Sequence, residues 1–241
     1  MSSMDICKGV EILVKFAKKY SHGFVILTYS IIYLILFAYL ENRTVYGYHV
    51  VDTVFDSHIP FCEFFIVPYL LWFPYMIGTV LYFIFKNNDK REYYQLILNL
   101  MMGMTVFLIV SYIYPNVLHL RPAEFPRDNI FTDLVRWLYR TDTPTNVLPS
   151  IHVFNSLAIH MSLTNCEALR DRRGIRRASL VLTVLIILST MFLKQHSVID
   201  VCLGSTLALF GHLLFYPQKA RESSRRRVAV AETGKGKRRR F

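Results

Sequence analysis

Residues 178–193 (ASLVLTVLIILSTMFL) and 201–216 (VCLGSTLALFGHLLFY) form two long apolar runs, and residues 194–200 (KQHSVID) separate them. Runs of this length are typical of helices that cross a bilayer, because about 20 helical residues span its hydrocarbon core of ~30 Å. The intervening stretch places Lys194, His196 and Asp200 at the junction. Ionisable side chains are costly inside a membrane unless they lie at a surface or in a polar cavity, so we expect this corner to carry a function.

The four-residue spacing of His196 and Asp200 suggests a working pair. If the chain becomes helical after His196, the carboxylate lies one turn away on the same face and can hold one imidazole nitrogen. The other nitrogen then remains free to attack an electrophile or to accept a proton. Alternatively, the two residues only cap the last helix. The spacing alone leaves both interpretations open.

The composition indicates an integral membrane protein. Of the 241 residues, 53% are hydrophobic and 15% are aromatic, and the mean hydropathy is +0.32. A net charge of +11 would suggest nucleic acid in a soluble protein, but in a membrane protein the distribution of the basic residues matters more, and we expect no nucleic-acid partner. The four cysteines lack the spacing of a zinc site or a disulfide framework.

The pattern of apolar runs predicts an all-α fold, a six-transmembrane-helix bundle that occupies residues 1–217. The expected spans are Phe24–Leu40, Phe64–Phe85, Tyr93–Tyr114, roughly Val147–Cys166, Ala178–Leu193 and Val201–Tyr216. The fourth of these is too polar to face lipid on all sides, because it contains Ser150, His152, Asn155, Ser156, His160 and Ser162. We therefore expect it to face the interior of the bundle.

The basic residues predict the orientation of the bundle. Of the 28 Lys and Arg residues, 22 lie in the N-terminal segment, the 86–92 and 167–177 loops and the C-terminal segment, whereas six lie in the loops on the other side. The positive-inside rule then places both termini in the cytoplasm, and Arg121, His152 and the Lys194–Asp200 corner on the extracytoplasmic face. With no retention signal at Arg239-Arg240-Phe241, a bacterial cytoplasmic membrane is the expected location.

Three segments flank or connect the spans. Asp5–Lys19 has helical spacing of apolar residues interleaved with lysines and is expected to be an interfacial helix. Residues 218–241 are strongly basic and are expected to be a disordered cytoplasmic tail that contacts anionic lipids. The Asn129–Arg140 segment is predicted to be a short helix that either roofs the site or lies as a belt in the interface.

The loop before the second span contains Asp52, Asp56, His58 and Glu63. These residue types ligate metals, but no helical or hairpin spacing aligns them. We interpret them as solvated loop charge and expect neither a metal nor another cofactor.

Residues that the topology brings to one face suit displacement at phosphorus. A phosphoryl group needs its oxygens neutralised, an in-line nucleophile and an acid for the departing oxygen. Arg121 can bind two phosphate oxygens, and the start of the fourth span, with the Ser150 hydroxyl, can form an anion cradle. His152 and His196 can supply the proton transfer and the nucleophile.

These residues resemble the motifs of the type 2 phosphatidic acid phosphatase superfamily, Lys-x6-Arg-Pro, Pro-Ser-Gly-His and Ser-Arg-x5-His-x3-Asp. Arg121-Pro122 matches the end of the first, and Pro149-Ser150-Ile151-His152 matches the second except for Ile151 in place of glycine. Ser189, His196 and Asp200 match the third. The order and spacing agree across residues 114–200, and the six-helix layout agrees over the whole chain.

The resemblance implies a role for each matching residue. His196 would be the nucleophile that forms a phosphohistidine, and Asp200 would orient it. His152 would protonate the leaving alcohol and then activate the acceptor, while Arg121 and Ser150 would hold the phosphate. In this family the reaction is metal-independent, and the substrate would be a lipid phosphate.

Two departures bear on the substrate. Tyr114 stands where the first motif has lysine and Thr190 stands where the third has arginine. Lys194 either supplies one of these missing cations or is an interfacial lysine that reaches the head groups. A site with fewer cations favours a phosphodiester over a dianionic monoester, which is similar to the branch that includes sphingomyelin and inositol phosphorylceramide synthases.

Three functions therefore remain open. The leading hypothesis is a membrane lipid phosphatase or phosphotransferase. The first alternative is a lipid phosphoalcohol transferase, in which a lipid alcohol replaces water as the acceptor. The second, from another class, is a non-catalytic membrane lipid transporter or scaffold with a degraded site, as Tyr114 and Thr190 would suggest.

Overall fold

A computed structural model describes residues 18–217 of the chain, and five of the helices in this part are long and apolar enough to cross a membrane. They are α2 (Gly23–Asn42), α3 (Ile66–Phe85, extended at its start by the 3-10 turn η2, Glu63–Phe65), α4 (Lys90–Ile113), α7 (Arg173–Phe192) and α8 (Val198–Phe215). Large apolar side chains on their outer faces are exposed in the isolated chain, as expected of surfaces that contact lipid. The chain is therefore a membrane protein.

Five of the six predicted spans are thus confirmed as long apolar helices. The fourth predicted span, Val147–Cys166, corresponds to the shorter helix α6 (Ile151–Asn165) of 15 residues. At 1.5 Å per residue α6 is about 22 Å long, less than the hydrocarbon core of a bilayer. A sixth crossing and the orientation of the termini stay predictions.

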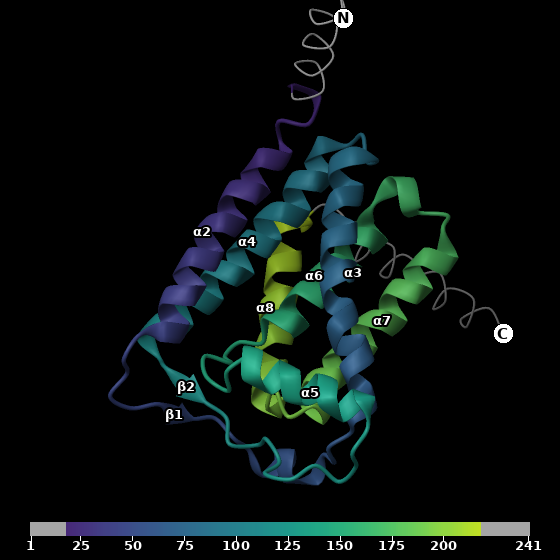
Figure 1. The fold of residues 1–241 in the computed structure, drawn as a ribbon. Helices are drawn as coiled ribbons and strands as arrows, with labels where there is room; N and C mark the ends of the chain where they lie inside the picture. Colours follow the sequence, from purple (N-terminus) through teal and green to yellow (C-terminus); the bar gives the residue numbers. More distant parts are fainter. Residues whose placement is uncertain (1–17, 218–241) are drawn as a thin grey trace, which may run out of the picture.

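Helix α6 lies at the centre of the bundle, against α3, α4, α7 and α8 (Figure 1). The prediction that it faces the interior is confirmed, because His152, Asn155, Ser156 and Ser162 are all buried. Small residues let the neighbouring helices approach it closely. A Cβ added at Gly103 of α4 would lie 2.0 Å from the ring of Phe154.

The shorter elements gather at one end of the bundle, around the start of α6 (Figure 1). The strands β1 (His49–Val50) and β2 (Asn116–Val117) pair in parallel, with His49 opposite Asn116. The side chain of Asn116 accepts hydrogen bonds from the backbone of Val147 and Leu148. The β2 strand therefore holds the segment that leads into Ser150.

The predicted helix at 129–140 is confirmed as α5 (Ile130–Thr141), which lies at the same end. Asn129 caps it by accepting from the backbone amides of Phe131 and Thr132. Val135 and Leu138 are buried against the start of α3, so α5 packs onto the bundle.

The interpretation of the acidic loop as solvated charge is wrong for two of its members. Asp56, in the 3-10 turn η1 (Val54–His58), is 2% exposed, and Glu63 is fully buried. Glu63 pairs with Arg127 at 3.1 Å, and its carboxylate also accepts from Asn129. Both carboxylates are buried because residues far along the chain supply their hydrogen bonds.

The connection from α6 to α7 contains the 3-10 turn η3 (Glu167–Leu169). The predicted interfacial helix, except for its last two residues, and the predicted basic tail lie outside residues 18–217.

Candidate active site

The corner between α7 and α8 is formed by two local motifs. Helix α7 ends in a Schellman motif, in which Gln195 N donates to Thr190 O at 2.9 Å and Lys194 N donates to Met191 O at 3.0 Å. Lys194 has a φ of 55°, the left-handed conformation that this motif usually gives to glycine. Ser197 then caps α8. The two motifs leave His196 between the helices, 6% exposed.

Asp200 serves both of the roles that its spacing suggested. Its Oδ2 lies 3.3 Å from Nδ1 of His196, and the same oxygen accepts from the backbone amide of Ser197 at 2.8 Å in a capping box. The carboxylate is fully buried. Helix capping and orientation of the imidazole are therefore combined in one side chain.

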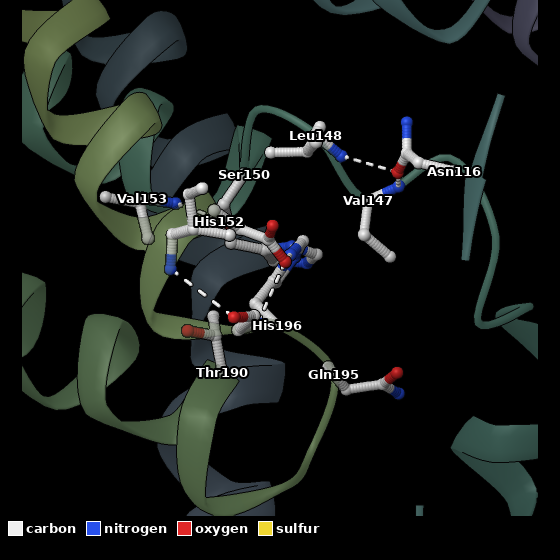
Figure 2. A network of polar contacts seen from close by, with 12 residues as sticks. Asn116, Val147, Leu148, Ser150, His152, Val153, Thr190, Gln195 and His196 are labelled. Carbon is white, nitrogen blue, oxygen red and sulfur yellow. Dashed lines mark hydrogen bonds and ion pairs between the residues drawn. The ribbon is translucent and has the colours of Figure 1, made fainter. Parts of the chain in front are cut away.

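His152 faces His196 from the first turn of α6 (Figure 2). Its Nδ1 lies 3.4 Å from Nε2 of His196, at long hydrogen-bond distance. The rings of Tyr69 and Trp72 in α3 cover His152, with centroids at 4.6 and 4.5 Å. The structure thus brings the two predicted histidines together under an aromatic wall.

When Asp200 is ionised and His196 is neutral, the contacts define which nitrogens of the two rings carry protons. An ionised carboxylate only accepts, so Nδ1 of His196 must carry the proton that faces Asp200. In neutral His196, Nε2 then holds a lone pair, and His152 must donate to it through Nδ1. The Nε2 lone pair of His196 therefore points towards His152, whose Nδ1 carries a proton.

Ser150 joins α6 to the first turn of α8. Its backbone amide donates to the carbonyl of Asp200 at 3.3 Å, and its hydroxyl caps α6 by accepting from Val153 N at 3.4 Å. A Cβ at Gly204 would lie 2.7 Å from the carbonyl oxygen of Ser150, so only glycine permits this approach. The position of Ser150 relative to Asp200 is set by direct contact.

Arg121 lies beside the corner and is bound mainly to carbonyl oxygens. Its guanidinium donates to Tyr139 O at 3.0 Å, to Asp142 O at 2.7 Å and to the side chain of Gln195 at 2.7 Å, and it stacks on the Tyr139 ring. Burial lowers the pKa of Arg121 below its usual range, but a guanidinium remains charged at neutral pH. Arg121 is therefore bonded to Gln195, the residue that directly precedes His196.

Two residues that sequence reasoning missed lie within this cluster. Tyr69 donates its hydroxyl to Oδ2 of Asp142 at 3.2 Å while its ring covers His152. Burial raises the pKa of Asp142, and the charges of His196 and Arg121 oppose that rise together with the Tyr69 bond. Asp142 lies just after α5, with no spacing relative to the motifs that could have identified it.

The amine of Lys194 points to backbone carbonyls of the loop before α3. Nζ donates to Asp56 O at 2.8 Å and to Ile59 O. Burial lowers the pKa of Lys194, and the nearby Asp56 opposes this shift. The residues at the positions of the two motif cations do not supply a positive charge. Thr190 is buried and donates to Ile187 O, and the ring of Tyr114 stacks on that of His49.

Asp56 is the third residue that sequence reasoning missed. Its carboxylate accepts from the Ser197 hydroxyl at 2.6 Å and from Val198 N at 2.9 Å, at the start of α8. Burial alone would raise the pKa of Asp56, but the bonds from Ser197, Thr53 and Val198 outweigh it and hold the pKa below its usual range. Its partners are too distant in sequence for any local pattern to reveal them.

Other features of the described chain lie away from the histidines. An apolar cavity of about 580 Å³ lies between α2, α3 and α4, lined by residues from the start of α2 and the end of α3, such as Phe24 and Phe85. Within residues 18–217, no group of three or more His, Cys, Asp and Glu side chains has the arrangement of a metal site.

The chain is similar to an uncharacterized protein of Methanocaldococcus jannaschii, with 27% identity over 160 residues. The matched region is 64% of this chain and 59% of that protein, so the match spans less than two thirds of the relative's length. No protein-family model matches the chain, and no solved structure matches it significantly.

Proposed function

We propose that this chain is a membrane enzyme that cleaves a lipid phosphate ester through a phosphohistidine at His196. The observation that carries the proposal is the position of His196, with Asp200 at Nδ1 and His152 at Nε2. A nucleophilic imidazole needs one nitrogen held by a base and the other free for the electrophile. It also needs an acid close to the bond that breaks.

The proposed first step breaks the phosphorus–oxygen bond. The Nε2 lone pair of His196 attacks phosphorus, the ester bond breaks, and His152 gives its proton to the departing alkoxide. The imidazole of His196 becomes positively charged, and Asp200 stabilises that charge. The contact between the two rings leaves no room for a phosphorus atom, so substrate binding must replace this hydrogen bond.

The second step transfers the phosphoryl group to an acceptor. Neutral His152 takes a proton from the acceptor hydroxyl, whose oxygen attacks phosphorus, and the phosphorus–nitrogen bond breaks. General acid–base catalysis of this kind contributes about 10²–10⁴-fold in rate. In this scheme Arg121 and Ser150 bind the phosphate oxygens, and Nε of Arg121 has no hydrogen-bond partner among residues 18–217.

The charges around the histidines support a phosphodiester substrate. Lys194 is bonded to carbonyl oxygens, Arg121 is partly occupied, and Asp142 adds a carboxyl group beside His196. A dianionic monoester would find few free cations to neutralise its two charges, and the carboxyl group of Asp142 would lie close to it. This supports the second candidate function, transfer of a phosphoalcohol from a phospholipid to a lipid alcohol.

Labelled lipids separate the possible reactions. Purified protein is incubated with labelled phosphatidic acid, and in parallel with a labelled phospholipid donor plus ceramide or diacylglycerol. Release of inorganic phosphate identifies a phosphatase, and a new labelled phospholipid identifies a transferase. Acid-labile label on the protein, present in wild type and lost in His196→Ala, would support the phosphohistidine.

A matched control uses a histidine outside the site. His58 is exposed in the loop before α3, so His58→Ala should retain turnover and labelling. If wild type and His196→Ala showed the same background turnover on every lipid phosphate, the enzyme proposal would be abandoned for a non-catalytic lipid transporter or scaffold.

A further inference from the structure

A second group of polar side chains lies at the other end of α6, away from the paired histidines. A pocket of about 270 Å³ is lined by His160, Thr164, Arg173, Arg176, Arg177 and Leu180. His160 is eight residues after His152 on α6, or about 12 Å along the helix. The pocket therefore belongs to the end of the bundle where α7 begins, and the proposed reaction does not use it.

The basic side chains of this pocket have few partners. Within residues 18–217, the side chains of Arg173 and Arg177 make no hydrogen bond or ion pair, and the side chain of Arg176 donates to the carbonyl oxygen of Arg170 at 3.3 Å. Arg173 is the first residue of α7, whose N-terminus has no side-chain cap. Three guanidiniums and the positive end of a helix dipole thus lie together, and no acidic side chain of the described part of the chain lines the pocket.

The inner wall of the pocket carries a hydrogen-bonding group, the ring of His160. Nδ1 of His160 lies 2.9 Å from the hydroxyl of Ser179, which also bonds to Tyr75 at 2.6 Å. This contact with the neighbouring helix α7 holds the His160 ring in place. The Thr164 hydroxyl donates to Met161 O at 2.8 Å, so the other ring nitrogen of His160 is the group on this wall that is left to meet a ligand, with apolar Leu180 beside it.

We infer that this pocket binds the phosphate headgroup of an anionic membrane lipid. Guanidiniums match phosphate oxygens, and basic pockets between transmembrane helices are suited to anionic headgroups. The exposed apolar side chains of α7 below the pocket, including Val181 and Val184, provide a surface for acyl chains. The site is on a lipid-facing helix, so the occupant is a bilayer lipid rather than a soluble phosphate.

The test measures lipid binding and does not depend on turnover. The full chain is titrated with phosphatidylglycerol and with phosphatidylcholine, and bound lipid is counted by native mass spectrometry. The test variant is Arg173→Gln with Arg177→Gln. The control is Arg170→Gln with Arg172→Gln, which removes the same charge from exposed positions of the same loop that do not line the pocket.

We expect saturable binding of phosphatidylglycerol, in preference to phosphatidylcholine. At about 1 kcal/mol per basic residue, the test variant should bind about 10- to 30-fold more weakly, and the control variant much less so. Equal loss in both variants would mean diffuse charge attraction and would overturn the inference. Displacement of the lipid by inorganic phosphate at equal concentration would overturn it as well.

Unfolding measurements on both variants separate a loss of binding from misfolding. The four substituted arginines are all exposed, so both variants should unfold like the wild type. Failure of this inference would leave the proposed reaction untouched, because no residue of the pocket contacts His152 or His196. Conversely, loss of catalysis in His196→Ala should leave phosphatidylglycerol binding at the pocket unchanged.

Discussion

Asp200 combines two tasks that are usually divided between residues. The carboxylate caps α8 through Ser197 and holds Nδ1 of His196. Asparagine can still cap a helix, but its amide carries no charge to stabilise an imidazolium. The two tasks can therefore be separated by a single substitution.

For Asp200→Asn, we expect kcat to fall by about 10²–10⁴-fold while the free energy of unfolding changes by about 1 kcal/mol or less. Turnover of a lipid phosphate and denaturant unfolding in detergent measure the two effects. If the free energy of unfolding fell but the folded fraction kept its full activity, Asp200 would act only as a helix cap.

Lys194 occupies a backbone conformation that favours glycine while its amine binds two loop carbonyls. Both Lys194→Gly and Lys194→Ala remove these bonds, but only glycine relieves the left-handed conformation. We therefore expect the alanine variant to be less stable than the glycine variant by about 1 kcal/mol.

Denaturant unfolding of the two Lys194 variants checks this difference, and their KM values test the alternative role. A large rise in KM in both variants, with unchanged stability, would mean that the amine binds the substrate phosphate.

Asp56 gives a prediction about pH. Because the pKa of Asp56 is held below its usual range in the folded chain, its ionised form contributes stability above the unfolded pKa, and this contribution is lost as pH falls through the folded pKa. The difference in unfolding free energy between wild type and Asp56→Asn should therefore shrink below about pH 4.

Unfolding curves at several pH values measure that difference. Glu124→Gln is the control, because Glu124 is exposed and should show little difference from wild type at any pH. A difference for Asp56→Asn that stayed constant from neutral to acid pH would contradict the role assigned to its ionised form.

At the scale of elements, the site depends on how closely α8 approaches the start of α6. Gly204 faces the carbonyl of Ser150, whereas Gly78, inside α3, has nothing within 4 Å of an added Cβ. Alanine at position 204 must push the two helices apart, and overpacking typically costs about 1–3 kcal/mol.

We expect Gly204→Ala to lower both stability and turnover, because it displaces Ser150 relative to His196. Gly78→Ala should be neutral or stabilising by up to about 1 kcal/mol, since alanine is the better helix former. Thermal unfolding and lipid turnover of both variants test this. Equal behaviour of the two would show that the contact at Ser150 is unimportant.

The helices could be predicted from the sequence because each depends on a local run of apolar residues. The pairing of His196 with Asp200 was also local, since one helical turn joins them. The contact of His152 with His196 followed only from the predicted topology and the resemblance, because 44 positions separate the two residues.

The supporting shell of the site could not be predicted in this way. Asp56 and Ser197 are 141 positions apart, and no periodicity connects them. Asp142 approaches the histidines through Tyr69, which comes from α3. An acidic residue in a loop is ordinarily solvated, so its burial can be recognised only once the fold has placed a donor beside it.

At the scale of the whole molecule, the distribution of basic residues predicts which end faces the cytoplasm. The paired histidines lie at the starts of α6 and α8. Those helix ends are on the side of the bundle that holds β1, β2 and α5, and the loop before α7 is on the other side (Figure 1). The positive-inside rule then assigns the histidines to the extracytoplasmic face.

Cysteine labelling tests this orientation. In a cysteine-free background, Tyr46→Cys, on the loop before β1, should react with a membrane-impermeant thiol reagent added to intact cells. Ala168→Cys, exposed in η3, should react only after the membrane is opened. The reverse pattern would invert the topology and place the histidines inside the cell.

The burial of Asp56 against the start of α8 has a genetic consequence. The turn that presents His196 and the loop between α2 and α3 pack as one unit, although 141 positions separate Asp56 from Ser197. A random screen for inactive variants should therefore recover substitutions near position 56 alongside those at the histidines, and second-site suppressors of the former should map to the beginning of α8.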